Sequence, residues 1–121
     1  MINSRAVTVA TVVGTVLQLA MVLVGHSNAS IAALFGPVGM GISLVAGLIY
    51  ASQARGSSVG SAALGGFVAG GLCALIGIVV SFALGDVTAL ILALGTLSSA
   101  VAGAIGGWVG RFAFSGAPRT V

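Results

Sequence analysis

Few side chains in this sequence could take part in chemistry, and the largest group of them lies along the first apolar segment. Thr8, Thr11, Thr15 and Gln18 recur at spacings of three, four and three residues, which places them on one face of a helix. Such a stripe could form the polar lining of a path for a solute. We expect instead that the threonine hydroxyls bond within or between helices. A buried amide needs a partner, so we expect Gln18 to clamp neighbouring helices together.

The one histidine and the one acidic residue, His26 and Asp86, lie in short polar segments between apolar runs. Asp86 precedes the fourth run, where an aspartate can cap free amides and face the positive end of the helix dipole. We expect this capping role. The alternative is a cation site at an outer mouth that Asp86 shares with His26.

The sequence lacks the components of the familiar catalytic sites. It contains no lysine, so the phosphate-binding loop that ends in lysine is missing. Only Ser27 and Ser81 could lie near His26, and no other nucleophile has a base nearby. Cys73 is the single cysteine, which excludes an internal disulfide and any multi-cysteine metal site. We therefore predict that the protein is not an enzyme and has no catalytic, cofactor-binding or metal-binding residues.

Charge is scarce over the whole chain. Of 121 residues, 4% are charged and 59% are hydrophobic, and the mean hydropathy is +1.28, whereas a soluble domain carries about a quarter charged residues. The outer surface must therefore face lipid, which makes the bilayer the expected partner. The arginines are too few and too scattered for a nucleic-acid surface. No apolar segment holds the charged group that an ion-coupled pump needs.

Four apolar segments are long enough to cross a bilayer as helices, which takes about 20 residues each. Short connections make consecutive helices antiparallel neighbours. The sequence thus predicts an all-α integral membrane protein, a four-transmembrane-helix bundle that forms one domain over residues 1–121. Gly36 and Pro37 predict a bend in the second helix. The expected spans are Ala6–Gly25, Ile31–Ala51, Ser61–Leu84 and Val87–Gly110.

Four crossings bring both termini and the middle loop to one side, and all the arginines then lie there. The positive-inside rule makes that side cytoplasmic. We expect a multi-pass protein of the cell inner membrane with cytoplasmic N- and C-termini. Tyr50, Trp108 and Phe112 near this boundary are typical of an aromatic belt. The arginines are Arg5, Arg55, Arg111 and Arg119.

The first apolar segment has a second interpretation. Arg5, the apolar run and Ser27–Ala29 resemble a secretory signal with a small-residue cleavage site. The run is about 20 residues long, which exceeds the usual apolar core of a signal. We therefore expect a retained first span.

The second and fourth spans share a pattern. A shift of 56 positions aligns nine identical residues over Ile31–Arg55, where biased composition alone gives roughly three. The match predicts two parallel-repeat helical hairpins. The alternative is that both helices converged on one packing pattern. The second-span members are Ala33, Leu34, Gly39, Ser43, Val45, Ala46, Gly47, Ile49 and Arg55.

Small residues four apart form strips along three of the spans. In lipid such strips let helix backbones approach closely, so we expect them to be the helix-packing residues. The fourth span has a second row at Gly106 and Gly110, more glycine than one bundle obviously needs. This excess predicts a homo-oligomer or docking onto other membrane subunits. The strips contain Gly39, Ser43, Gly47, Gly66, Gly70, Gly95, Ser99, Gly103 and Gly107.

From Val45 to Arg111 the chain resembles uncharacterised glycine-rich four-span membrane proteins of bacteria. The resemblance is carried by Gly65–Gly70 and by Gly103–Arg111. It implies a four-helix fold and a bacterial inner membrane, and no activity. A looser likeness to conjugative pilin precursors around Phe35–Gly39 departs from that pattern in the fourth span and the retained N-terminal segment.

The function we expect is that of a non-enzymatic membrane protein that acts through helix–helix association, as an accessory or scaffolding subunit or a homo-oligomer. The alternative is a small channel or facilitator for a neutral or weakly charged solute, lined by the Thr8–Gln18 stripe. Solute flux in liposomes distinguishes the two.

Overall fold

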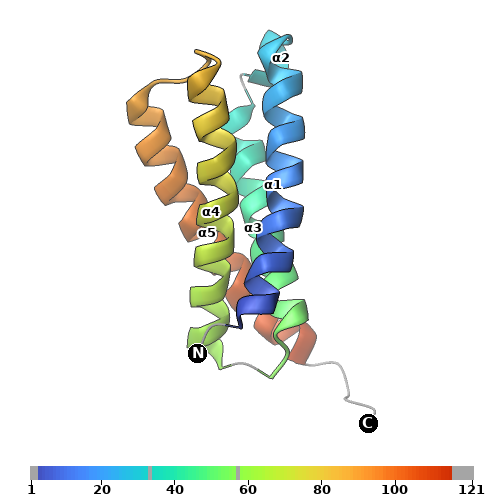
Figure 1. Cartoon of the computed structure of the whole chain (residues 1–121). Coiled ribbons are helices and arrows are strands. Elements are labelled where there is room, and N and C mark those ends of the chain that lie inside the picture. The colour runs from blue at the N-terminus through green and yellow to red at the C-terminus, as the bar shows by residue number, and fades with distance from the viewer. Residues whose placement is uncertain (1–2, 33, 57, 116–121) are drawn as a thin grey trace.

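The computed structural model describes residues 3–32, 34–56 and 58–115, and within these ranges the secondary structure is entirely helical, as the sequence predicts. The elements are α1 (Ser4–His26), α2 (Ala29–Ala32), α3 (Phe35–Gln53), α4 (Val59–Ala83) and α5 (Ala89–Ser115). Four long helices form a bundle, and the short α2 lies between α1 and α3 (Figure 1). Three helices, α1, α4 and α5 as far as Phe114, are long and apolar enough to cross a membrane.

The second expected span, Ile31–Ala51, differs most from the structure. The helix that spans the bundle there is α3, which begins at Phe35 and has 19 residues. Pro37 therefore lies in its first turn, where backbone N–H groups have no partner within a helix in any case. The proline begins this helix and is not the site of a bend. α3 is also the long helix that falls outside the three membrane-crossing candidates.

The expectation that Asp86 caps the fourth helix is wrong. α5 begins at Ala89, and the Thr88 hydroxyl accepts a hydrogen bond from the Ile91 N–H at 3.3 Å. Asp86 instead ends the turn after α4. Gly85 adopts a φ of 81° there, and the Asp86 N–H donates to the Ser81 carbonyl at 3.0 Å. This left-handed turn closes α4 and favours glycine at its bend.

α3 and α4 form the centre of the bundle, and each packs against both α1 and α5. Large apolar side chains point outward and small ones point inward. The exposed fraction is 66% for Leu90 and 62% for Val16, but 0% for Ala46 and Ala69. Small interior residues let the backbones approach, and large apolar side chains on the outside are typical of helices that pack in lipid.

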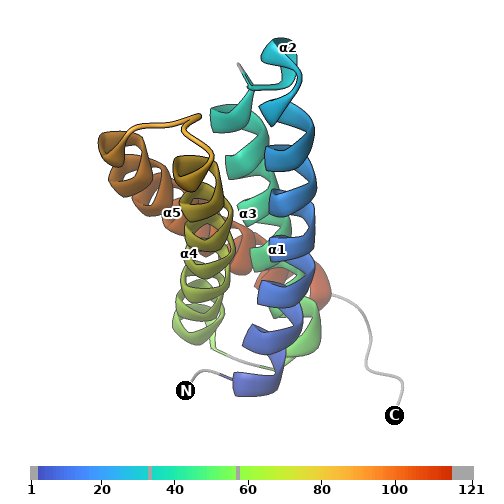
Figure 2. The same ribbon diagram turned by 45° about the horizontal axis from the view of Figure 1, so that its top comes forward.

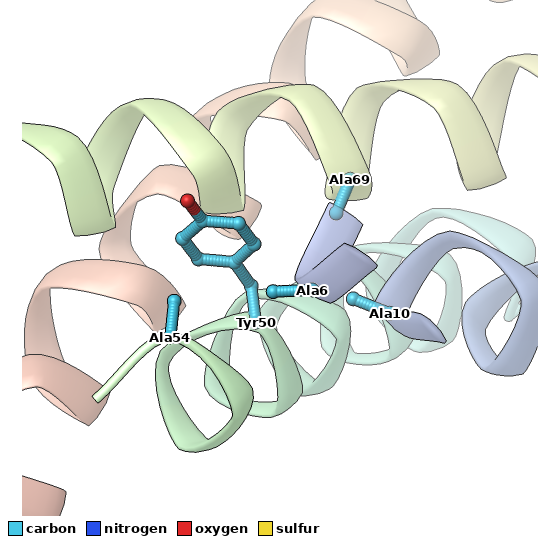
Figure 3. Packing of buried hydrophobic residues seen from close by; sticks show 5 residues of the cluster. All are labelled: Ala6, Ala10, Tyr50, Ala54 and Ala69. Carbon is cyan, nitrogen blue, oxygen red and sulfur yellow. The ribbon is translucent and has the colours of Figure 1, made fainter. Parts of the chain in front are cut away.

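Tyr50 is the largest side chain that is fully buried. Its ring lies among alanines of α1 and α4 and Ala54, the residue directly after α3 (Figure 3). It also lies directly over Gly65, where an added Cβ would overlap it. Its hydroxyl accepts a hydrogen bond from the Asn3 N–H at 2.9 Å. The expected place of Tyr50 in an interfacial belt is therefore wrong, whereas Trp108 and Phe112 are exposed and touch edge to face.

The bundle has two distinct ends. The start of α1, the loop after α3 and the end of α5 lie together at the end that we call the Arg55 end (Figure 1). The loops after α1 and α4 lie at the opposite end, the His26 end. Arg5, Arg55 and Arg111 belong to the first end by their positions in these elements, and Arg119 lies outside the described residues.

The two expected hairpins, α1–α3 and α4–α5, run in the same direction. Their second helices have different surroundings, because α3 packs on α1, α4 and α5, whereas α5 packs on α3 and α4. The shared sequence pattern of α3 and α5 therefore does not give the two helices equivalent positions, and the repeat stays a prediction.

Candidate functional site

Glycine contacts hold α5 against α3 and α4 toward the Arg55 end. A Cβ atom added to Gly47 would overlap the carbonyl oxygen of Gly103, and one added to Gly103 would overlap the carbonyl oxygen of Gly66. Gly70 and Gly107 also lie against the backbone of a facing helix. Only a hydrogen side chain permits this approach. These five residues of the predicted strips thus meet inside the bundle.

The second glycine row of α5 is used inside the bundle as well. Gly106 abuts the carbonyl oxygen of Leu44, and a Cβ added to Gly110 would lie 2.7 Å from the Ala51 Cβ. α3 and α4 thus cover both rows of α5. Internal contacts account for the excess of glycine from which the sequence analysis inferred partners.

Toward the His26 end the strips no longer bring backbones together. A Cβ added to Gly39 would lie 3.6 Å from the Gln18 Oε1, and one added to Gly95 would lie 2.8 Å from the Ile78 Cδ1. Both glycines therefore face side chains. Ser99, the next member of the α5 strip, is buried at the wall of a cavity. α5 crosses the bundle obliquely (Figure 2). Its second half therefore packs closely on α3 and α4, whereas its first half leaves a space between itself and the other helices.

Gln18 is the centre of a buried polar cluster. Its Nε2 donates to the Gly39 carbonyl oxygen at 3.1 Å and to the Ser43 Oγ at 3.3 Å. The Ser43 hydroxyl in turn donates to the Gly70 carbonyl at 3.1 Å, and the Cys73 thiol donates to the same carbonyl at 3.3 Å. Gln18 thereby joins α1 to α3, and Ser43 joins α3 to α4.

The threonines of the predicted stripe lie apart from this cluster. Thr8 is exposed and its hydroxyl donates to the Ser4 carbonyl within the same helix at 2.9 Å. Thr11 and Thr15 are half-buried, and their enclosed hydroxyl oxygens have no hydrogen-bond partner in the part of the chain that the structure describes. The structure thus brings Gln18, but not the threonines, into the core. The buried face of α1 is formed by Ala6, Ala10, Gly14, Gln18, Val22 and Gly25.

His26 and Asp86 form a pair at the His26 end. The His26 Nδ1 lies 2.8 Å from the Asp86 Oδ2, with the side chains 48% and 22% exposed. The left-handed turn at Gly85 presents Asp86 to the end of α1. The sequence analysis placed these two residues at one surface, and the structure brings them into contact.

A cavity of about 90 Å³ lies among the four long helices toward the His26 end. The residues with polar side chains in its lining are Gln18, Ser81, Ser98 and Ser99. Ser81 is 1% exposed, and its hydroxyl has no hydrogen-bond partner among the described residues. The Ser98 hydroxyl, by contrast, donates to the Leu94 carbonyl of its own helix at 2.7 Å. The remaining lining residues are Met21, Val22, Gly36, Gly39, Met40, Ala74, Ile78, Val87, Ile91 and Gly95.

A second hollow of about 530 Å³ is an open groove on the outer face of α4 and α5. Its lining is almost entirely apolar. The exception is Thr96, whose enclosed hydroxyl oxygen bonds none of the described residues. We call it the α4–α5 groove, and it is lined by Phe67, Val68, Gly71, Leu72, Leu75, Ala89, Leu92, Ala93, Thr96, Leu97 and Ala100.

The chemistry available in these sites is recognition by hydrogen bonds and apolar contact. Among the described residues no group of three metal-binding side chains gathers, and the polar neighbours of Cys73 are neutral. The sequence analysis did not assign Ser81 to a site. A signal was present, because Cys73, Gly77 and Ser81 recur every four residues and so share one face of α4.

No protein-family model, curated protein or solved structure matches the chain.

Proposed function

We propose that this chain is a non-enzymatic integral membrane protein that acts through helix–helix association, and that its specific assembly is a homodimer. The observation that carries the proposal is the α4–α5 groove. Both glycine rows of α5 are covered by α3 and α4, which leaves this groove as the face with small residues at its floor and an enclosed hydroxyl that no described residue bonds.

The groove is self-complementary. Gly71, Ala93 and Ala100 provide depressions, and neighbouring Leu72 and Leu97 provide large, exposed side chains. A two-fold axis places the same patch on both partners, so the large side chains of one copy can fill the depressions of the other.

Substitution of the groove floor tests the dimer. Ala93→Leu fills the groove, and Ala20→Leu makes the same change at an exposed position of α1, which does not line the groove. We expect native mass spectrometry from mild detergent to give a dimer for the wild type and for Ala20→Leu, and a monomer for Ala93→Leu. A wild type that is monomeric, or a dimer that survives Ala93→Leu, contradicts the proposal.

A crosslink tests the geometry independently. With Cys73 replaced by serine, Thr96→Cys puts the sole thiol of each copy at the groove floor. We expect oxidation in native membranes to yield a disulfide-linked dimer. Thr8→Cys, on the exposed part of α1, is the control that is expected to stay monomeric under the same treatment.

We further propose that the protein crosses the bacterial inner membrane four times with the Arg55 end in the cytoplasm. Three helices qualify as spans by length and hydropathy, and α3, which packs against all of them, is the fourth. Three arginines belong to the Arg55 end and the one acidic residue to the opposite end, which supports this orientation.

A solute facilitator is the second candidate, favoured by the cavity that reaches Gln18 from the His26 end. Beyond Gln18 the interior is tightly packed, since a Cβ added to Gly14 would lie 2.8 Å from the Cys73 Sγ. Flux of a neutral solute into liposomes tests it. Flux that Gln18→Leu or Thr15→Leu abolishes favours transport over association, and tight liposomes argue against it.

A further inference from the structure

We propose that the end of α5 binds an anionic phospholipid, with the headgroup phosphate at Arg55 and Arg111 and the acyl chains along the exposed aromatic face of α5. The Arg55 Cζ lies 5.4 Å from the centre of the Phe114 ring. Arg111 precedes Phe114 by three residues, and residues at this spacing are neighbours on the surface of a helix. α5 therefore places its own arginine beside the ring that carries the arginine of the loop after α3.

The charge at this place favours an anion as the ligand. Two positive charges close together repel each other, and the sequence has no acidic side chain at this end to neutralise them. Asp86 is its single acidic residue, and it pairs with His26 at the opposite end of the bundle. A phosphate group fits because the planar guanidinium presents paired N–H donors to phosphate oxygens.

The surroundings of the arginines favour a lipid headgroup over a soluble anion. Trp108 lies three residues before Arg111, so the two are also neighbours on α5. Ile105, Trp108 and Phe112 are 47%, 49% and 54% exposed, and their spacing of three and four residues puts them on one face. This face belongs to a segment that is long and apolar enough to cross a membrane, and tryptophan is enriched at the membrane interface. Acyl chains that lie along it bring the headgroup to the arginines.

This inference goes beyond the proposed dimer and rests only on the proposed placement of the chain in a bilayer. None of the residues that it uses lines the α4–α5 groove. It also holds for either orientation of the bundle, because a vesicle with the same lipids in both leaflets presents the headgroup to both ends.

Trp108 reports on the site directly, because it is the only tryptophan in the sequence. We would reconstitute the protein in dioleoyl phosphatidylcholine and replace part of this lipid with phosphatidylglycerol or phosphatidylcholine that carries bromine on its acyl chains. Bromine quenches tryptophan fluorescence on contact, and the two brominated lipids share their chains and phosphate group but differ in net charge. We expect phosphatidylglycerol to reach half of its maximal quenching at a mole fraction about tenfold lower than phosphatidylcholine, because each arginine near the membrane surface favours anionic lipid about fivefold.

Arginine variants separate this site from the general charge of the Arg55 end. Arg55→Gln should reduce the preference for phosphatidylglycerol about fivefold, and Arg111→Gln provides a second variant with the same expectation. Arg5→Gln makes the same change at the same end on α1, which packs on α3 and α4, so it should leave the preference as in the wild type. Circular dichroism checks that each variant is folded.

The outcomes distinguish a lipid from a free anion. Inorganic phosphate, added at constant ionic strength, should leave the quenching by phosphatidylglycerol unchanged, and its reversal by phosphate would overturn the lipid assignment. Equal quenching by the two lipids, or a preference that Arg5→Gln lowers as much as Arg55→Gln does, would also overturn it. Quenching by neither lipid would contradict the placement of α5 in a bilayer, and the lipid site with it.

Discussion

One side-chain amide, that of Gln18, makes hydrogen bonds between helices in the interior. Gln18 is 2% exposed and donates to both the Gly39 carbonyl and Ser43. Interhelical hydrogen bonds within membranes are worth about 0.6 kcal/mol on average and at most about 1.7 kcal/mol. We expect Gln18→Leu to destabilise the bundle by about 1 kcal/mol in detergent unfolding with SDS, followed by circular dichroism. Thr8→Val, which changes an exposed residue bonded to its own helix, is the control and should leave stability unchanged.

The His26–Asp86 pair makes a different residue-scale prediction. The pair is partly exposed, and even a fully charged pair at such a place contributes at most about 1 kcal/mol. We expect His26→Ala to lower the free energy of unfolding by less than Gln18→Leu does in the same assay. We also expect faster amide hydrogen exchange in the loop at Asp86, because the histidine ties that loop to the end of α1. Exchange rates that match the wild type would show that the turn at Gly85 holds the loop without the histidine.

At the scale of the helices, the crossing of α5 over α3 depends on particular glycines. Gly47 lies against the Gly103 carbonyl, whereas a Cβ added to Gly41 in the same helix meets nothing within 4 Å. Gly47→Ala must push the helices apart, and overpacking of this kind costs about 1–3 kcal/mol. Gly41→Ala should be neutral or stabilise by up to about 1 kcal/mol through helix propensity. SDS unfolding of the two variants tests the contrast, and equal effects would contradict the close contact.

The sequence predicts the number of long helices and the residues at which backbones can approach. It does not predict which helix covers which strip, because a row such as Gly103 and Gly107 presents the same surface to any partner. Covering both rows of α5 needs the oblique crossing that only the assembled bundle defines. The starts of the second and fourth helices were predicted wrongly for local reasons. Pro37 fits the first turn of a helix as well as a bend, and Thr88 competes with Asp86 as a cap.

The candidate site, too, is only partly predictable from the sequence, because spacing along a helix is visible there and packing between helices is not. The helical spacing of Thr8, Thr11, Thr15 and Gln18 is visible in the sequence, but all four cannot face the core, and packing selects Gln18. The unpaired state of Ser81 is a property of its neighbours in space.

At the scale of the whole molecule, the proposed orientation follows from the separation of charge between the two ends of the bundle. Gln53 and Ser27 are exposed at the Arg55 end and the His26 end respectively. In a chain whose native Cys73 is replaced by serine, we expect a membrane-impermeant maleimide to label Ser27→Cys in intact spheroplasts. Gln53→Cys should be labelled only after permeabilisation, because the arginines keep that end in the cytoplasm.

The same assay tests the number of crossings. Phe112→Cys, near the end of α5, must behave as Gln53→Cys does, because an even number of spans separates Gln53 from it. Labelling of Gln53→Cys and Phe112→Cys from opposite faces would contradict the four-span arrangement. Labelling of both from outside, with Ser27→Cys protected, would keep four spans and reverse the orientation. The Cys73→Ser parent should remain unlabelled after permeabilisation, which shows that each signal comes from the introduced thiol.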